Sequence, residues 1–108
     1  MKKETFYRTK RNDKNIIYFV SDQGYLHYIF WGKIGFTCAI CKTPYGWDIT
    51  HYESGLRICT RYFETMKKAL EYITFEPYLI AIDEMLKDAN VNKYIQELEQ
   101  YKKEMEIK

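Results

Sequence analysis

The chain has 108 residues, of which 46% are hydrophobic, 18% aromatic and 30% charged. This length accommodates one compact domain and excludes a large multidomain enzyme, and the high aromatic content excludes an intrinsically disordered chain. Seventeen Lys and Arg against fifteen Asp and Glu give a net charge of +2, which is too small to indicate a nucleic-acid-binding protein on its own.

The charge is unevenly distributed along the chain. Residues 1–15 carry six basic and two acidic side chains, whereas residues 64–108 carry seven basic and ten acidic ones. A basic arm and an acidic C-terminal third can orient a molecule toward a charged partner, and ordinary solvated surface charge explains the pattern equally well.

No apolar run has the length of a membrane span and the polar start does not resemble a signal peptide, so we expect a cytoplasmic protein without membrane contact.

Short aromatic and β-branched runs alternate with turn residues from residue 5 to residue 62, which is typical of an antiparallel β-meander. Glycines in Asp22-Gln23-Gly24, Gly32-Lys33, Thr43-Pro44-Tyr45-Gly46 and Glu53-Ser54-Gly55 suit four hairpin turns. We therefore expect five or six strands, at roughly residues 5–10, 16–21, 25–31, 34–42, 47–52 and 56–62.

Alternation along the last three of these strands divides their side chains between two faces of the sheet. The face toward the core is expected to hold Ile34, Phe36, Cys38, Ile40, Trp47, Ile49, Leu56, Ile58 and Tyr62. The opposite face carries small and polar groups, and we expect it to meet solvent or a partner; its residues are Thr37, Ala39, Cys41, Asp48, Thr50, Tyr52, Arg57, Cys59 and Arg61.

After residue 63 the apolar residues recur at helical spacing. A first helix that begins near Glu64 or Thr65 should cover the sheet, and a second should begin at Pro77, which is tolerated at a helix start. Asn90 and Asn92 mark a break before a third, charged helix, which packs on the second as an αα-hairpin or forms a homodimer with another copy. The predicted fold class is α+β, in a single domain over residues 1–108 with a β-sheet region (1–63) and a helical region (64–108).

No constellation of side chains in the sequence predicts catalysis or a cofactor. Cys38, Cys41, His51 and Cys59 have the chemistry of zinc ligands, but residues three apart in a strand point to opposite faces. An odd number of cysteines also argues against a disulfide framework, so we expect free thiols. His27 and His51 have no nucleophile and orienting acid in a recognisable pattern, and the glycines form no phosphate loop, so we expect a protein that is not an enzyme.

Residues 46–73 combine a strand that begins at Trp47, a Ser-Gly turn, a strand with Arg57 and Arg61, the sequence Phe63-Glu64-Thr65, and a helix that contains Ala69. This arrangement resembles the AP2-like arm-binding domain of phage and transposon integrases. In that family three antiparallel strands backed by a helix lay the sheet's exposed face in the major groove. The resemblance implies DNA contacts from Arg57, Arg61, Thr50 and Tyr52.

The general character of the chain indicates a small protein of a mobile element. Lys outnumbers Arg 13 to 4 and Ile outnumbers Val 12 to 2, a bias typical of AT-rich bacterial, phage or plasmid genes. We expect a binding protein that engages and inhibits a host nucleic-acid-processing protein, such as a nuclease effector, in the manner of anti-CRISPR proteins. The alternative is direct DNA binding, and for either partner the expected binding residues are Tyr45, Tyr52, Arg57 and Arg61.

Overall fold

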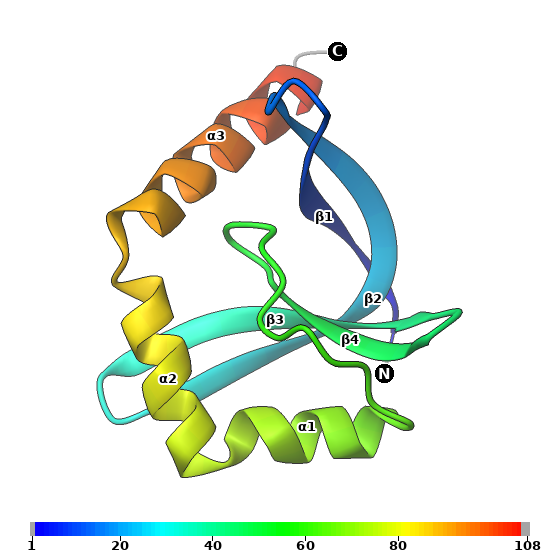
Figure 1. Ribbon diagram of the computed structural model, residues 1–108, viewed down its shortest axis with the longest axis vertical. Helices are drawn as coiled ribbons and strands as arrows, with labels where there is room; N and C mark the ends of the chain where they lie inside the picture. The colour runs from blue at the N-terminus through cyan, green and yellow to red at the C-terminus, as the bar shows by residue number, and fades with distance from the viewer. Residues whose placement is uncertain (1, 107–108) are drawn as a thin grey trace.

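The computed structural model describes residues 2–106, with the side chains of Trp31 and Ile34 outside the described part, and it confirms an α+β fold (Figure 1). An antiparallel sheet in the order β1-β2-β3-β4 precedes three helices. The strands are β1 (Glu4–Arg11), β2 (Ile17–Trp31), β3 (Ile34–Thr43) and β4 (Gly46–His51), and the helices are α1 (Met66–Thr74), α2 (Glu76–Leu86) and α3 (Ala89–Glu106).

The expectation of five or six strands was wrong, in part because two of the expected strands are one. β2 runs through the Asp22-Gln23-Gly24 segment, where the sequence predicts a hairpin, and bends there instead. β1 pairs with residues 17–24 and β3 with residues 25–31, so each half of β2 has a different neighbour. Gly24 permits this bend, because a Cβ there would lie 2.9 Å from both the Ile40 carbonyl oxygen and the Phe6 ring.

The second error concerns residues 56–62, which do not form a strand. They make only isolated bridges to β4, between Thr50 and Arg57 and between Trp47 and Phe63. The loss of regular alternation is visible at Ile58 and its neighbour Cys59, which both pack against the same core. Tyr62, expected on the core face, is 38% exposed.

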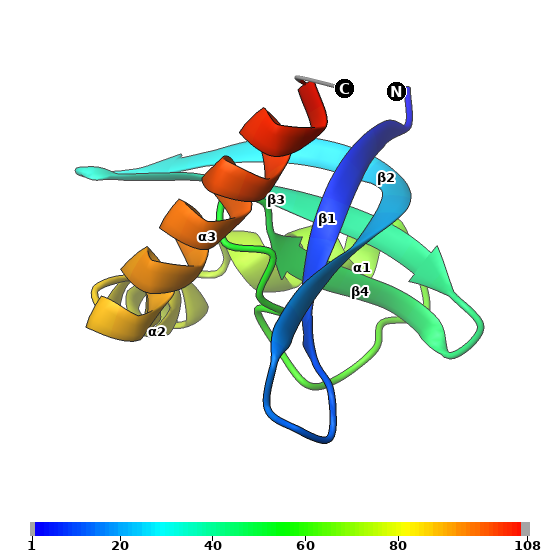
Figure 2. The ribbon, with the colours of Figure 1, turned by 90° about the horizontal axis from the view of Figure 1, so that it is seen from above.

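The bend in β2 folds the β1–β2 hairpin across β3 and β4, as Figure 2 shows from above. The Thr9 amide donates a hydrogen bond of 2.9 Å to the Gly55 carbonyl, which ties β1 to the loop after β4. The sheet therefore curls into a partial barrel. The face that was expected to meet solvent is covered by this hairpin, and Ala39, Cys41 and Thr50 on it are at most 3% exposed.

Two groups of apolar residues fill the two sides of β3. The larger group lies between the sheet and the helices and confirms the predicted burial of Phe36, Cys38, Ile40 and Ile49, joined by Phe63, Ala69, Ile73, Leu79 and Ile82. The smaller group consists of Phe6, Ala39 and Cys41, with Leu26 and Tyr52 partly buried beside it. The first core has many large members, whereas the second depends on the ring of Phe6.

Local signals in the sequence located the helix starts. The Thr65 hydroxyl accepts a hydrogen bond from the Lys68 amide and caps α1, and Pro77 lies in the first turn of α2. The break between α2 and α3 lies at Lys87 and Asp88, slightly before the predicted Asn90.

The predicted αα-hairpin does not form. α2 and α3 meet at an angle at their junction, and α3 extends away along the β1–β2 hairpin (Figures 1 and 2). Tyr101 of α3 lies 5.6 Å from the ring of Tyr7 and 4.9 Å from the ring of Phe19. The apolar stripe of α3 is thus used within the chain. Among residues 2–106, no helix is both long and apolar enough to cross a membrane.

Candidate functional site

A surface groove of about 390 Å³ lies between the β1–β2 hairpin and the β3–β4 turn. We call it the cationic groove, because three of its residues are basic, while both of its carboxylates are paired with an arginine. It is lined by Arg8, Lys10, Asp22, Lys42, Thr43, Pro44, Tyr45, Asp48 and Tyr62.

The floor of the cationic groove is an ion-pair network centred on Arg8. Its guanidinium donates to Asp48 at 2.8 and 3.2 Å and to Asp22 at 3.0 Å. Burial alone would lower the pKa of Arg8, but the two carboxylates outweigh it and raise the pKa. Asp22 is also partly desolvated, yet the Gln23 amide and Arg8 hold the pKa of its carboxyl below the ordinary value. Arg8 thus engages both carboxylates of the groove.

Tyr45 and Tyr62 form one wall of the groove, with Arg57 behind Tyr62, and we call these three side chains the Tyr–Arg ladder. The rings of Tyr45 and Tyr62 lie 5.6 Å apart, and the Arg57 guanidinium lies 4.1 Å from the centre of the Tyr62 ring. Arg57 also donates to the Tyr62 hydroxyl at 3.3 Å and to the Arg61 carbonyl at 3.1 Å. These contacts fix Tyr62 between its neighbours, while Tyr45 is 78% exposed and presents its ring to solvent.

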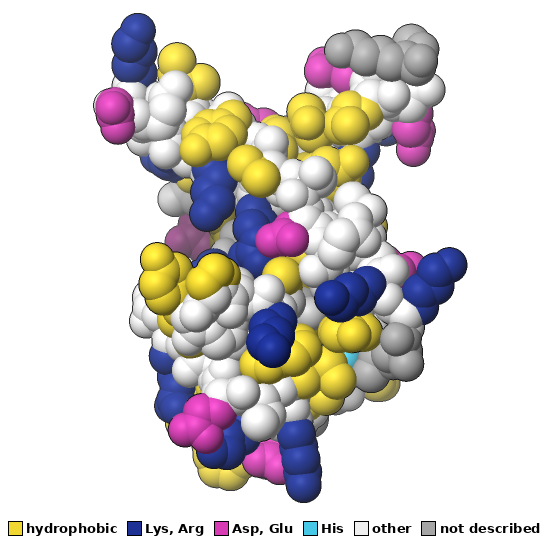
Figure 3. Space-filling model, turned by 90° about the vertical axis from the view of Figure 1, so that its right-hand side faces the viewer, with side chains coloured by type: hydrophobic (Ala, Val, Ile, Leu, Met, Phe, Trp, Pro, Cys, Tyr) yellow, Lys and Arg dark blue, Asp and Glu magenta, His cyan; other side chains and the backbone are white. Residues whose placement is uncertain are grey.

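Four cations around this wall have no carboxylate partner. Lys10, Lys42, Arg57 and Arg61 are exposed and form no ion pair with any described part of the chain. In Figure 3 basic side chains are interleaved with hydrophobic ones across the face of the molecule that includes the β3–β4 turn. The combination of unpaired positive charge and exposed aromatic surface suits a ligand that is both anionic and planar.

The structure brings three of the four predicted binding residues together. Tyr45 and Arg57 belong to the Tyr–Arg ladder, and Arg61 follows it with its guanidinium 4.9 Å from the Phe63 ring. Tyr52 lies elsewhere: it is half-buried, with the Lys102 ammonium 4.3 Å from its ring, beside α3. The sheet face that Tyr52 was expected to share with Thr50 is covered at Thr50 by Arg8 of β1, and Tyr52 lines a separate pocket beside α3.

Sequence reasoning missed Tyr62, Lys10 and Lys42 as members of this site. Tyr62 was assigned to the core by an alternation that its segment does not follow. Lys10 is distant in sequence from the β3–β4 turn and reaches the groove only because β2 bends. The one local signal available was a tyrosine, Tyr62, that directly follows Arg61 and lies five residues after Arg57.

A second polar cluster lies in the turn after β4. The Ser54 hydroxyl is 2.6 Å from His51 Nδ1, and His51 Nε2 is 2.9 Å from the Glu53 carboxylate. This order of groups resembles a nucleophile, base and orienting acid. Ser54 is completely buried, however, and its oxygen also accepts from the Leu56 amide at 3.1 Å, so the cluster holds the turn rather than facing a substrate.

Glu53 shows how this turn is held. Burial would raise the pKa of its carboxyl, but hydrogen bonds from His51 and from the Thr37 amide outweigh it and lower the pKa.

The thiols nearby are placed for packing: Cys38 faces the larger core, where burial raises its pKa to about 12, and Cys41 faces the smaller one. Within residues 2–106, no group of three or more His, Cys, Asp or Glu side chains is arranged to hold a metal ion.

Comparisons of the chain with protein-family models, with curated proteins and with solved structures find no match. The functional argument therefore depends on the geometry of the cationic groove and the Tyr–Arg ladder.

Proposed function

We propose that this protein is a non-catalytic binding protein that holds a single strand of nucleic acid in the cationic groove, with a base stacked on Tyr45. The observation that carries the proposal is the set of four exposed cations without ion pairs around an exposed tyrosine ring. Phosphates are attracted by unpaired Lys and Arg, and unstacked bases bind aromatic rings with little sequence preference.

The ladder favours a single strand over a duplex. Tyr62 supports Tyr45 from behind at 5.6 Å, and Arg57 supports Tyr62 in turn, so the outer ring is held in place before a ligand arrives. A base inside a duplex is already stacked and offers its face to no side chain. Reading of duplex DNA by the sheet face, as the integrase resemblance implies, would require Thr50, which is 1% exposed.

The second candidate function is inhibition of a nucleic-acid-processing host protein, such as a nuclease effector, by a small phage or plasmid protein. The observation that favours it is apolar: Tyr28 and Phe30 are 67% and 72% exposed near the β2–β3 turn. This turn lies at the opposite end of β3 from the cationic groove (Figure 1). Exposed aromatic side chains of this kind are enriched in protein–protein hot spots.

The proposal is tested by fluorescence anisotropy with a labelled single strand and with the matching duplex, each at low and near-physiological salt. We expect the single strand to bind more tightly and the affinity to fall steeply as salt increases. Tyr45→Ala should weaken binding roughly tenfold, as expected for the loss of one base–aromatic stack. Replacing Lys10 and Lys42 with Gln should lower the slope of log affinity against log salt by about 1.4.

Two matched variants serve as controls. Tyr28→Ala removes an equally accessible tyrosine, and Lys33→Gln removes an exposed lysine from the distant β2–β3 turn. Neither should alter the affinity or the salt slope. If no nucleic acid binds at low salt, the proposal is wrong; in that case, loss of host-protein capture in Tyr28→Ala alone would support the second candidate.

A further inference from the structure

The first half of β2 has one edge without a strand partner. Residues 17–24 pair with β1, and β3 begins its pairing only at Tyr25. Across the described chain, the hydrogen bonds to the backbone of residues 17–22 come from β1 alone. Backbone N–H and C=O groups on such an edge form a template for another strand.

The side chains along this edge lack the features that normally protect it. Residues 15–21 read Asn-Ile-Ile-Tyr-Phe-Val-Ser and contain no charge, proline or glycine. Ile16, Tyr18 and Val20 are 56%, 46% and 42% exposed. Natural proteins blunt an open edge with lysine, proline, bulges or a covering segment, and an uncharged edge of β-branched and aromatic residues associates with other strands.

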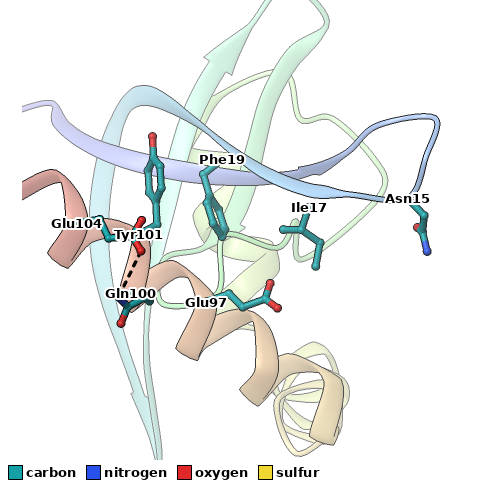
Figure 4. A pocket seen from close by; sticks show the side chains of 7 residues that line it. All are labelled: Asn15, Ile17, Phe19, Glu97, Gln100, Tyr101 and Glu104. Carbon is teal, nitrogen blue, oxygen red and sulfur yellow. Dashed lines mark hydrogen bonds between the residues drawn. The ribbon is translucent and has the colours of Figure 1, made fainter.

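The alternate side chains of the same segment line a second groove. A pocket of about 440 Å³ lies between β2 and α3 and is lined by Asn15, Ile17, Phe19, Glu97, Gln100, Tyr101 and Glu104. Figure 4 shows Ile17 and Phe19 pointing from the strand toward the helix. A strand added to the edge would therefore place alternate side chains in this groove and the others beside Tyr18 and Val20.

We propose that the occupant of this edge is a second copy of the chain, paired antiparallel through β2 in a two-fold symmetric dimer. The segment is complementary to itself in the register that places Tyr18 opposite Tyr18 of the second copy. Ile16 then faces Val20, and Ile17 faces Phe19, which gives apolar pairs on both sides of the new sheet. Residues 17–21 carry no charge, so this two-fold pairing opposes no like charges along the strand.

The same register suits the acidic wall of the α3 groove. Ile17 and Phe19 of β2 line this groove together with Glu97 and Glu104, and the Phe19 ring lies 4.9 Å from the Tyr101 ring. The second copy would bring the uncharged side chains of its own residues 17 and 19 into the groove. Lys10 shares a face with Tyr18, its cross-strand partner, so the two cationic grooves of the dimer lie on one face.

Sedimentation equilibrium of the full chain, from about 1 to 100 µM, tests the proposal. We expect a reversible dimer that Tyr18→Lys converts to a monomer, because two lysines would then oppose each other at the symmetry axis. Tyr28→Lys is the matched control, since it places the same charge at an exposed tyrosine on the other half of β2, and it should leave the dimer intact. A wild-type monomer at every concentration, or a dimer that survives Tyr18→Lys, overturns the proposal.

Cross-linking gives a second readout that does not depend on the lysine variant. In a Cys59→Ser background the remaining native thiols, Cys38 and Cys41, are buried. Tyr18→Cys should then form an intermolecular disulfide when an oxidant is added, because residue 18 meets its own copy. Tyr28→Cys should form no intermolecular disulfide under the same conditions. Equal cross-linking of both variants contradicts the assigned axis.

Discussion

The two faces of β3 are both buried, but by different means. The face toward α1 is closed by a broad apolar core with Ile40 and Ile49 at its centre, both 0% exposed. The face toward the β1–β2 hairpin is closed by the ring of Phe6 and by the Arg8 network with Asp48 and Asp22. Apolar packing is insensitive to charge and salt, whereas the second closure depends on ionised groups.

The proposed site follows from this difference. A purely apolar closure would leave no charged groups at its margin, whereas the polar closure ends at the surface as the cationic groove. Arg8 pairs with both Asp22 and Asp48 at the floor, and Lys10 and Lys42 at the margin leave the lining of the groove with one net positive charge. The Arg8 network therefore both helps to hold the hairpin and determines the electrostatic character of the surface beside it.

The largest expected effect comes from removing the one large apolar side chain of the second face. Phe6→Ala should lower the free energy of unfolding by about 3–4 kcal/mol, because it leaves a cavity beside Ala39 and Cys41. Urea denaturation followed by circular dichroism measures the change. Phe30→Ala, which truncates a phenylalanine that is 72% exposed, should cost less than about 0.5 kcal/mol. A small effect at Phe6 would mean that the ion pairs alone hold the hairpin.

The next largest effect comes from removing a carboxylate from the Arg8 network, which closes the same face of β3. Asp48→Asn should destabilise the fold by about 2 kcal/mol, because Asp48 is 4% exposed at its side chain and Arg8 would lose its buried partner. Asp22→Asn removes the other carboxylate, which is 43% exposed, and should cost under about 1 kcal/mol. Equal losses from the two variants would show that burial does not distinguish the two ion pairs.

Much of the first face could be predicted from the sequence, because it depends on local rules. Alternation placed Cys38, Ile40 and Ile49 correctly, and the Thr65 cap and Pro77 located two helix starts. Two of the four expected hairpin turns were also correct, and Gly32 and Gly46 adopt positive φ in them.

The second face could not be predicted, because alternation assigns a side chain to a face but does not say what covers that face. Covering depends on the bend in β2, and Asp22-Gln23-Gly24 is the same local signal for a bend as for a hairpin. The Tyr–Arg ladder was partly missed for a related reason. Residues 56–62 read as a strand, but their bridges to β4 are isolated, so Tyr62 turns outward.

A smaller effect appears when the pH is lowered. The folded-state pKa of Glu53 lies below its ordinary value of about 4.5, so its stabilisation is complete above that value and is lost as the pH falls through the folded value. Glu53→Gln should therefore reduce stability at pH 7 and flatten the loss between about pH 5 and 3. Thermal unfolding across this range measures it. Glu71→Gln, at an exposed position of α1, is the control and should preserve the slope.

The smallest expected effect on stability is the coupling between Arg57 and Tyr62 in the Tyr–Arg ladder, at the edge of the cationic groove. A double-mutant cycle with Arg57→Ala and Tyr62→Leu should give a coupling energy of about 0.5 kcal/mol, the size of an exposed cation–π contact. Arg57→Lys keeps the charge but loses the planar group, so it should show most of the same loss. Additive single effects would mean that Tyr62 is not held by Arg57. Tyr45 would then lack a fixed support. In that case Arg57→Ala should weaken the binding of a single strand only as much as the loss of one positive charge does.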